Sequence, residues 1–315
     1  PPPTFQAEDG IRDTSHCLVG SEMCIRDSDG TDPQTAGPIN APLSVTASGV
    51  YCALKTTVDP NSLIPPNSGC WRAIEVTAPK GSLLNAEFPS PVVYANHEIS
   101  HRLADMVMGA LVNFWPEQVM ACSQGTSAIL TLGGVDPRSG NRYVSYETVK
   151  GGFGARPNKD GINVVSSGIS NTMNTPIEVL EMAFPVRVLE YSVAPDTGGA
   201  GTFRGGNAAR RIWQLQEDAT AIGTLCMERM TSPPFGLAGG KPGSAAIVKL
   251  KTPDGKIHDL PSKGAFKAPG GSIVDMITPG SGGFGDPAKR DEAALADDLT
   301  EGYITEAGKR RDYGR

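Results

Sequence analysis

Apolar side chains recur at helical spacing in two stretches of the first 120 residues. The first stretch covers 42–58, and the Asp-Pro pair at 59–60 ends it, since the residue before a proline disfavours helix. The second follows Asn96, a good N-cap residue, and stops at Pro116. Between the two stretches, residues 71–78 alternate between opposite faces, which predicts a strand.

After residue 128 the pattern changes to short alternating segments. A turn is predicted at 136–140, a short helix at 176–183, and a last polar helix from Pro287 with Asp286 as its N-cap. Strands are predicted at 129–132, 142–149, 162–165, 186–191, 210–216, 219–226, 245–250 and 272–278. Early helices and late strands predict an α+β fold, mixed and strand-rich in its C-terminal half, rather than a doubly wound sheet.

Charge and composition narrow the classes of function. The net charge of -6 lacks the basic excess that nucleic acid or an anionic membrane attracts. No apolar run approaches the ~18 residues that a membrane span needs. The six cysteines form neither a C-x-x-C pair nor a zinc-site spacing, which predicts buried thiols in a reducing compartment. We therefore expect a cytoplasmic protein without nucleic-acid or membrane partners.

The first 28 residues, PPPTFQAEDGIRDTSHCLVGSEMCIRDS, show no sustained apolar period. They resemble translated sequencing-adapter sequence that has been fused to a real gene. We interpret residues 1–28 as non-native sequence without fixed structure and exclude them from fold reasoning. On this interpretation the natural protein begins further upstream, and this chain is the C-terminal part of a larger subunit. A natural polar N-terminal arm is the alternative.

The sharpest local motif is H-E-x-x-H, formed by His97, Glu98 and His101. On a helix this spacing places two imidazoles on one face around zinc, with the glutamate as base. The metzincin continuation fails here, because Ala104 stands where a glycine belongs and no further histidine follows. A zinc hydrolase is therefore an alternative function, and polar residues in the first turn of a helix are the simpler interpretation.

Glycine-rich stretches recur at 151–154, 198–206 and 280–285. None continues as G-K-[ST], so the sequence has no P-loop. The last stretch matches G-x-G-x-x-G, but no βαβ unit surrounds it. We expect these glycines to serve turns or close backbone approach.

Ten strings in order resemble the hydantoinase B/oxoprolinase family, which also includes a subunit of acetone carboxylase. They cover nearly everything from about Asp29 to the end, so residues 29–315 are identified as the portion of that type. The strings are GTDPQ (30–34), GPINAP (37–42), NSGCWRAIEVTAP (67–79), SHRLADMVMGAL (100–111), SQGT (123–126), YETVKGGFGARP (146–157), SNTMNTPIEVLE (170–181), PDTGGAGTFRGG (195–206), LPSKG (260–264) and TPGSGGFGDP (278–287).

The resemblance implies ATP-dependent opening of a cyclic amide such as a hydantoin or 5-oxoproline. An A-type partner subunit or domain binds ATP and phosphorylates the ring carbonyl, and the B-type portion directs water onto the activated carbon. A divalent metal is expected in the complete subunit, whereas the family's metal-binding motif lies before this chain begins. The resemblance therefore implies an enzyme that is inactive as this isolated portion. A non-catalytic scaffold half of the complex is a further alternative.

The substrate-facing side chains are expected on loops rich in glycine and asparagine. An anionic phosphorylated amide needs donors that do not compete as nucleophiles, such as amides, backbone N–H groups and one arginine fork. Turn formation is the other interpretation, in which the asparagines cap the helix after Pro176. The candidates are Ser123, Gln124, Asn171, Asn174, Asp196 and Arg204.

Overall fold

A computed structural model gives the fold and describes residues 18–19, 22–26 and 31–315. The chain divides into two compact units, residues 1–120 and 121–315. Most of segment 1–28 lies outside the described residues, and its interpretation as non-native sequence stays a prediction.

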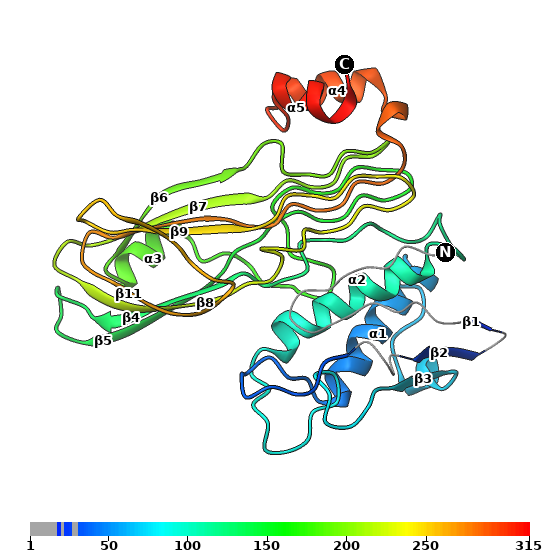
Figure 1. The fold of residues 1–315 in the computed structure, drawn as a ribbon, viewed down its shortest axis with the longest axis horizontal. Helices are drawn as coiled ribbons and strands as arrows, with labels where there is room; N and C mark the ends of the chain where they lie inside the picture. Colours follow the sequence, from blue (N-terminus) through cyan, green and yellow to red (C-terminus); the bar gives the residue numbers. More distant parts are fainter. Residues whose placement is uncertain (1–17, 20–21, 27–30) are drawn as a thin grey trace. The chain divides into compact units, whose positions relative to one another are not determined.

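Unit 1 is built on two helices, α1 (Leu43–Val58) and α2 (Ser100–Leu111), which pack against each other (Figure 1). Gly49 of α1 allows the close approach, because a Cβ there would lie 3.1 Å from the carbonyl oxygen of Ser100. A small sheet in the order β1-β2-β3 completes the unit, with β1 at Leu18–Val19, β2 at Glu22–Arg26 and β3 at Ile74–Thr77. Helix α1 confirms the boundaries that the sequence pattern predicts.

The second helix differs from its prediction at both ends. A π-turn, η2 (Ala95–Ile99), precedes α2, so Asn96 lies inside this turn and is not an N-cap. The helix ends at Leu111 rather than at Pro116. Phe114 would be the last apolar residue on the buried side of the predicted helix, but it is exposed. The buried apolar face therefore ends one turn earlier than the sequence indicates.

Unit 2 contains a sandwich of two antiparallel sheets (Figure 1). One sheet has the order β10-β9-β12-β7-β6 and the other the order β11-β8-β4-β5. Together with the separate helices, these sheets confirm the α+β prediction. The strands are β4 (Ile129–Val135), β5 (Arg142–Thr148), β6 (Val186–Val193), β7 (Ala209–Leu215), β8 (Thr220–Cys226), β9 (Ile247–Lys251), β10 (Ile257–Asp259), β11 (Lys263–Ala268) and β12 (Ile273–Ile277).

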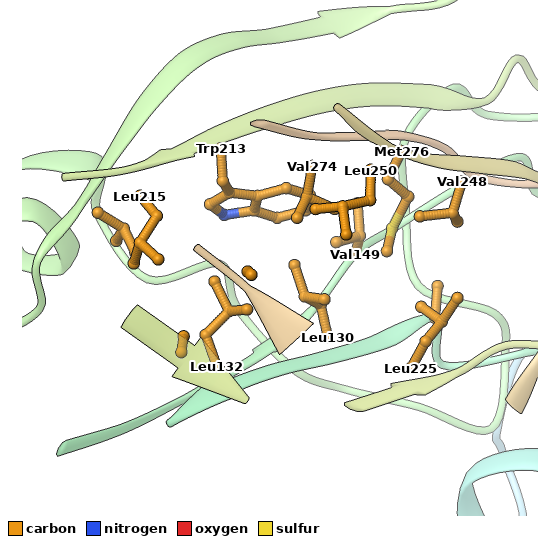
Figure 2. Packing of buried hydrophobic residues seen from close by; sticks show 14 of the residues in the cluster. Leu130, Leu132, Val149, Trp213, Leu215, Leu225, Val248, Leu250, Val274 and Met276 are labelled. Carbon is orange, nitrogen blue, oxygen red and sulfur yellow. The ribbon is translucent and has the colours of Figure 1, made fainter. Parts of the chain in front are cut away.

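The core of unit 2 lies between the two sheets. Figure 2 shows Trp213 and Met276 from one sheet facing Leu130 and Leu225 from the other. Burial alternates strictly along β7, as expected for a strand with one face on a core. Helix α3 (Ile177–Ala183) packs on β6 and adds one buried side chain, that of Leu180, to the same core.

Later in the chain, two strands were missed, one predicted strand did not form, and the last helix does not begin where it was predicted. Strand β10 is exposed, and β11 buries only Ala268 fully and Phe266 in part, so neither carries an apolar alternation that a sequence pattern would reveal. Residues 162–165 form only an isolated bridge, between Gly151 and Val165. The expected last helix is instead the 3-10 turn η3 (Pro287–Lys289), capped by Asp286, followed by two short helices.

Extended glycine-rich segments pack side by side near the sandwich (Figure 1). We call this region the glycine bundle; its segments are 121–125, 151–155, 160–163, 198–206, 236–243 and 280–285. A Cβ on Gly152 would lie 2.1 Å from the oxygen of Gly206, and one on Gly282 would lie 1.8 Å from that of Phe235. Backbone hydrogen bonds join the segments, such as Gly282 N–H to the oxygen of Cys122 at 2.8 Å. Only glycine fits such contacts between backbones.

The two C-terminal helices, α4 (Glu292–Thr300) and α5 (Glu306–Tyr313), pack on this bundle. Their shared apolar cluster joins Leu295, Ile304 and Tyr313 to Ala200 of the bundle. The carboxylate of Asp291 caps α4 by accepting from the Ala294 N–H at 3.0 Å. The helix pair thus covers part of the glycine bundle, whose segments bury few apolar side chains among themselves.

We predict that Gly206→Ala destabilises the protein by about 2 kcal/mol or more, because the new methyl group meets backbone atoms that are themselves hydrogen-bonded. The ideal Cβ at this position lies 2.0 Å from the oxygen of Ile162. Urea unfolding gives the measurement. Gly168→Ala is the matched control, since its Cβ would meet nothing nearer than 3.8 Å. Equal unfolding midpoints for the two variants would refute close packing as the reason for glycine.

Candidate functional site

A buried face of η2 and α2 carries four ionisable side chains in unit 1. They are Glu98, His101, Arg102 and Asp105, and none is more than 5 % exposed. Spacings of three and four residues place them on one side of the helical segment. Each of them has an interaction partner. Buried ionisable groups are costly and gather at functional sites, so this face is the first candidate site.

The H-E-x-x-H motif lies on this face but does not have the form of a zinc site. Its first half lies in the π-turn η2, and only His101 lies in α2. Burial lowers the pKa of His97, which is half-buried. Among the described residues, no group of three or more His, Cys, Asp or Glu side chains is arranged to hold a metal ion. The zinc alternative therefore has no third protein ligand in this part of the chain.

Ser123 and Gln124 lie together on the first segment of the glycine bundle. The hydroxyl of Ser123 accepts a hydrogen bond from the Gly154 N–H at 3.1 Å. Gln124 donates its own N–H to the oxygen of Gly152 at 2.8 Å. Its side chain is buried against Gly151, and its Oε1 has no hydrogen-bond partner. A buried amide oxygen with spare capacity, among backbone groups, fits a role in holding a polar ligand.

Asp196 and Arg204 lie elsewhere, where they hold the C-terminal helices. Asp196 accepts from both the N–H and the hydroxyl of Thr305, the N-cap of α5, at 2.7 and 2.6 Å. The Arg204 side chain is buried and donates through Nε to Asp298 of α4 at 3.1 Å. It also donates to the oxygen of Gly205 at 2.7 Å and stacks over Tyr303. These contacts favour a structural role for both residues.

A second arginine completes this ion network. Arg290 pairs with Asp160 at 2.8 Å and with Asp298, so two guanidinium groups face two carboxylates. Burial alone would raise the pKa of Asp160, but Arg290 and Arg204 outweigh burial and lower it. Burial alone would lower the pKa of Arg290, and the two carboxylates raise it instead. Burial raises the pKa of the neighbouring Tyr313 to about 12.

The two asparagines lie on the exposed segment before α3. Asn174 donates to the hydroxyl of Tyr191 at 2.8 Å, and Asn171 is exposed. Neither caps the helix, whose N-cap position is Pro176 without a side-chain cap. The contacts thus divide the six candidates into three groups, and their substrate-facing roles stay a prediction.

Unit 1 also contains a cavity of about 540 Å³ between α1 and the segment 64–74. Apolar side chains such as Leu54, Ile64 and Trp71 line most of it, and the Lys55–Asp59 ion pair lies at its edge. A hydrogen bond from Lys55 is the main cause that lowers the pKa of Asp59 to about 2. None of the candidates predicted from the sequence lines this cavity.

Sequence reasoning missed several buried charges. Arg102 and Asp105 continue the spacing of Glu98 and His101, so a search for charged residues at helical spacing would have found them. Lys150 and Arg211 gave no such signal, because each lies singly in a strand or a loop.

The hydantoinase B/oxoprolinase family model matches residues 4–287. Among curated relatives, the 5-oxoprolinase of Dictyostelium discoideum is 36% identical over 84% of this chain and 20% of its own length. The B-type subunit of a putative D-/L-hydantoinase from a Pseudomonas species is 31% identical over 94% of this chain and 50% of its own. The chain thus spans half the length, or less, of these relatives.

A solved structure shares the fold. The ATP-dependent caprolactamase of Pseudomonas jessenii superimposes with a TM-score of 0.79 at 31% identity. The match covers 90% of this chain and 50% of the caprolactamase chain.

Arg204→Met is predicted to lower the free energy of unfolding by about 3 kcal/mol, because it removes one cation from a buried network. The measurement is chemical denaturation, with Arg187→Met on the exposed face of β6 as the matched control. An Arg204→Met variant as stable as the control would remove the structural explanation and favour a substrate-facing Arg204.

The contribution of Asp160 should depend on pH. Its folded-state pKa is lowered, so its stabilising effect is complete above the unfolded value of about 3.9 and is lost as the pH falls through the folded value. The stability difference between the wild type and Asp160→Asn should be constant from about pH 5 to 8 and shrink below about pH 4. Denaturation at several pH values measures it, and the exposed Asp218→Asn is the control. A difference that is unchanged in acid would contradict the ion pairing.

Proposed function

The chain belongs to the hydantoinase B/oxoprolinase family, and from this we propose that it is part of an ATP-dependent enzyme that opens a cyclic amide. The observation that carries the proposal is the match to the ATP-dependent caprolactamase over 90% of the chain. The names of the 5-oxoprolinase and hydantoinase relatives support it, because their ring compounds are also cyclic amides. The particular amide is left open.

The proposed chemistry explains why ATP is needed. An unstrained amide carbonyl is a poor electrophile, and phosphorylation of its oxygen creates a leaving group and an electron-poor carbon. The sequence has no P-loop, so we assign ATP binding to an A-type partner subunit or domain. The hydantoinase relative is named as one subunit of its enzyme, which supports the existence of such a partner.

This chain would contribute the shape and polar lining of the site. We assign the contact with the activated amide to Gln124, whose Oε1 can accept a hydrogen bond from a ligand N–H, and to the neighbouring Ser123. The hydrogen-bonded backbone around these two residues would hold their side chains in place without reorganisation during the reaction.

We assign no catalytic role to a metal ion bound by the described residues. The described residues hold no group of three or more His, Cys, Asp or Glu side chains fit for one. We propose that any divalent metal of the complete subunit is held by residues outside this chain. No step of the reaction is therefore assigned to a metal held by these residues.

We also propose a cytoplasmic location. The four described cysteines form no disulfide, which suits a reducing compartment; they are Cys52, Cys70, Cys122 and Cys226. In the described part of the chain, no helix is both long and apolar enough to cross a bilayer.

The test combines this chain with the upstream half of its subunit, as encoded in its gene, and with the A-type partner. We expect ring opening of 5-oxoproline, a hydantoin or caprolactam with matching ADP release, and no ring opening by this chain alone. Gln124→Ala should lower kcat/KM about 30-fold, which corresponds to about 2 kcal/mol of transition-state stabilisation. The matched control is Gln118→Ala, which removes an exposed amide.

Two outcomes would overturn parts of the proposal. Ring opening by the purified chain with ATP would remove the need for a partner. Full activity of a folded Gln124→Ala variant would make the first bundle segment structural and favour the scaffold alternative for this half.

A further inference from the structure

Arg211 is a buried cation whose hydrogen bonds are incomplete. It points into unit 2 from β7, is 1 % exposed, and stacks between the rings of Tyr191 and Trp213 at 5.0 and 5.1 Å. Its Nη1 lies 2.8 Å from Oε2 of Glu147, without hydrogen-bond alignment. Its Nε and Nη2 have no hydrogen-bond partner. Buried donors without partners are rare and costly, so this edge requires an explanation.

The edge of Arg211 without partners is formed by Nε and Nη2. Two other arginines of this chain bind carboxylates through these same two atoms. Nε and Nη2 of Arg210 donate to the two oxygens of Asp275 at 3.1 and 2.8 Å. The same two atoms of Arg138 donate to Asp136. Two parallel N–H groups match the two oxygens of one carboxylate. The corresponding edge of Arg211 is thus preformed for a carboxylate that the described residues do not supply.

A second buried cation belongs to this cluster. Lys150 is 6 % exposed and donates to the hydroxyls of Thr148 and Thr172 at 3.0 and 2.8 Å. Among the described residues it forms no ion pair. Burial lowers its pKa, and the more distant charge of Glu147 opposes this shift. Two cations therefore share one carboxylate, Glu147, and one positive charge is left uncompensated.

An exposed segment separates this cluster from solvent. Residues 170–174 reach it through Thr172, which accepts from Lys150, and through Asn174, which donates to Tyr191. Both residues are exposed, so their partners Lys150 and Tyr191 lie only one layer below the surface. Displacement of this short segment would open a path to Lys150 and Arg211.

We propose that Lys150 and Arg211 form a binding site for the carboxylate group of a small molecule. The carboxylate would take the Nε–Nη2 edge of Arg211 in two hydrogen bonds, and the positive charge of Lys150 would add to the attraction. A single negative charge balances the cluster, whereas a phosphate dianion would leave it negative by one. Asn174 and Thr172 would then contact the rest of the ligand, which gives the sequence-predicted Asn174 a position at the entrance.

The experiment measures binding to the full chain without ATP or a partner, so its result is independent of the proposed function. The probes are acetate, 5-oxoproline, 2-pyrrolidone (the same ring without the carboxylate) and inorganic phosphate, at constant ionic strength. We expect acetate and 5-oxoproline to raise the melting temperature and to bind in calorimetry, and 2-pyrrolidone to have no effect. Acetate should also raise the titration midpoint of Lys150 in NMR spectra of 13C-labelled lysine, because an anion favours the ammonium form.

The variants separate this site from general anion effects. Lys150→Met should weaken carboxylate binding at least tenfold, and Lys249→Met on the exposed face of β9 should leave it unchanged. Arg211→Lys keeps the charge but loses the paired donors, and should also weaken binding. Equal binding by Lys150→Met and Lys249→Met, tighter binding of phosphate, or no response to either carboxylate would overturn the proposal.

Discussion

Contact between backbones, without side chains in between, is the constraint on which unit 2 depends. In the glycine bundle the nearest neighbours of Gly152, Gly206 and Gly282 are carbonyl groups of other segments, at distances that exclude a methyl group. Segments so close can satisfy their N–H and C=O groups only with one another, which fixes their register. The bundle therefore gains order from hydrogen bonds rather than from apolar burial. It holds Gln124 and Ser123 in place although neither lies in a helix or strand.

The glycine bundle has few side chains to pack together, so contacts with neighbouring elements must stabilise it. The sandwich core supplies this support at β7 and β12, and the helix pair α4–α5 supplies it through Ala200 and the ion network. In that network two arginines face two carboxylates, so burial leaves no net charge. In a balanced buried pair the attraction offsets much of the cost of desolvation, whereas loss of one partner leaves a buried charge unpaired and is strongly destabilising.

Sequence patterns predicted those parts of the fold that local burial determines. Helix α1 and strands β4 to β8 have periodic apolar residues and clear turn signals, and the structure confirms them within a few residues. Strand β11 buries only Ala268 fully and pairs through its backbone, so no apolar pattern marked it. The sequence predicts a substrate-facing Arg204 because an arginine fork suits an anion; its partner Asp298 lies 94 residues away, and no local pattern shows such a pairing. Distant pairing of charges is therefore the information that the sequence alone lacked.

The number of carboxylates around each buried arginine separates the arginines of unit 2 into two kinds. The sequence alone does not show this difference. Arg204 and Arg290 have carboxylate partners in Asp160 and Asp298, and their donors serve the docking of α4 and α5. Arg211 has one misaligned carboxylate, two stacked rings and an open edge, and it shares that carboxylate with Lys150. Folding alone would favour an apolar side chain at such a position, because an incompletely paired buried cation destabilises the native state. An uncompensated charge in a core that is otherwise well packed is therefore the reason for proposing that Arg211 binds an anion.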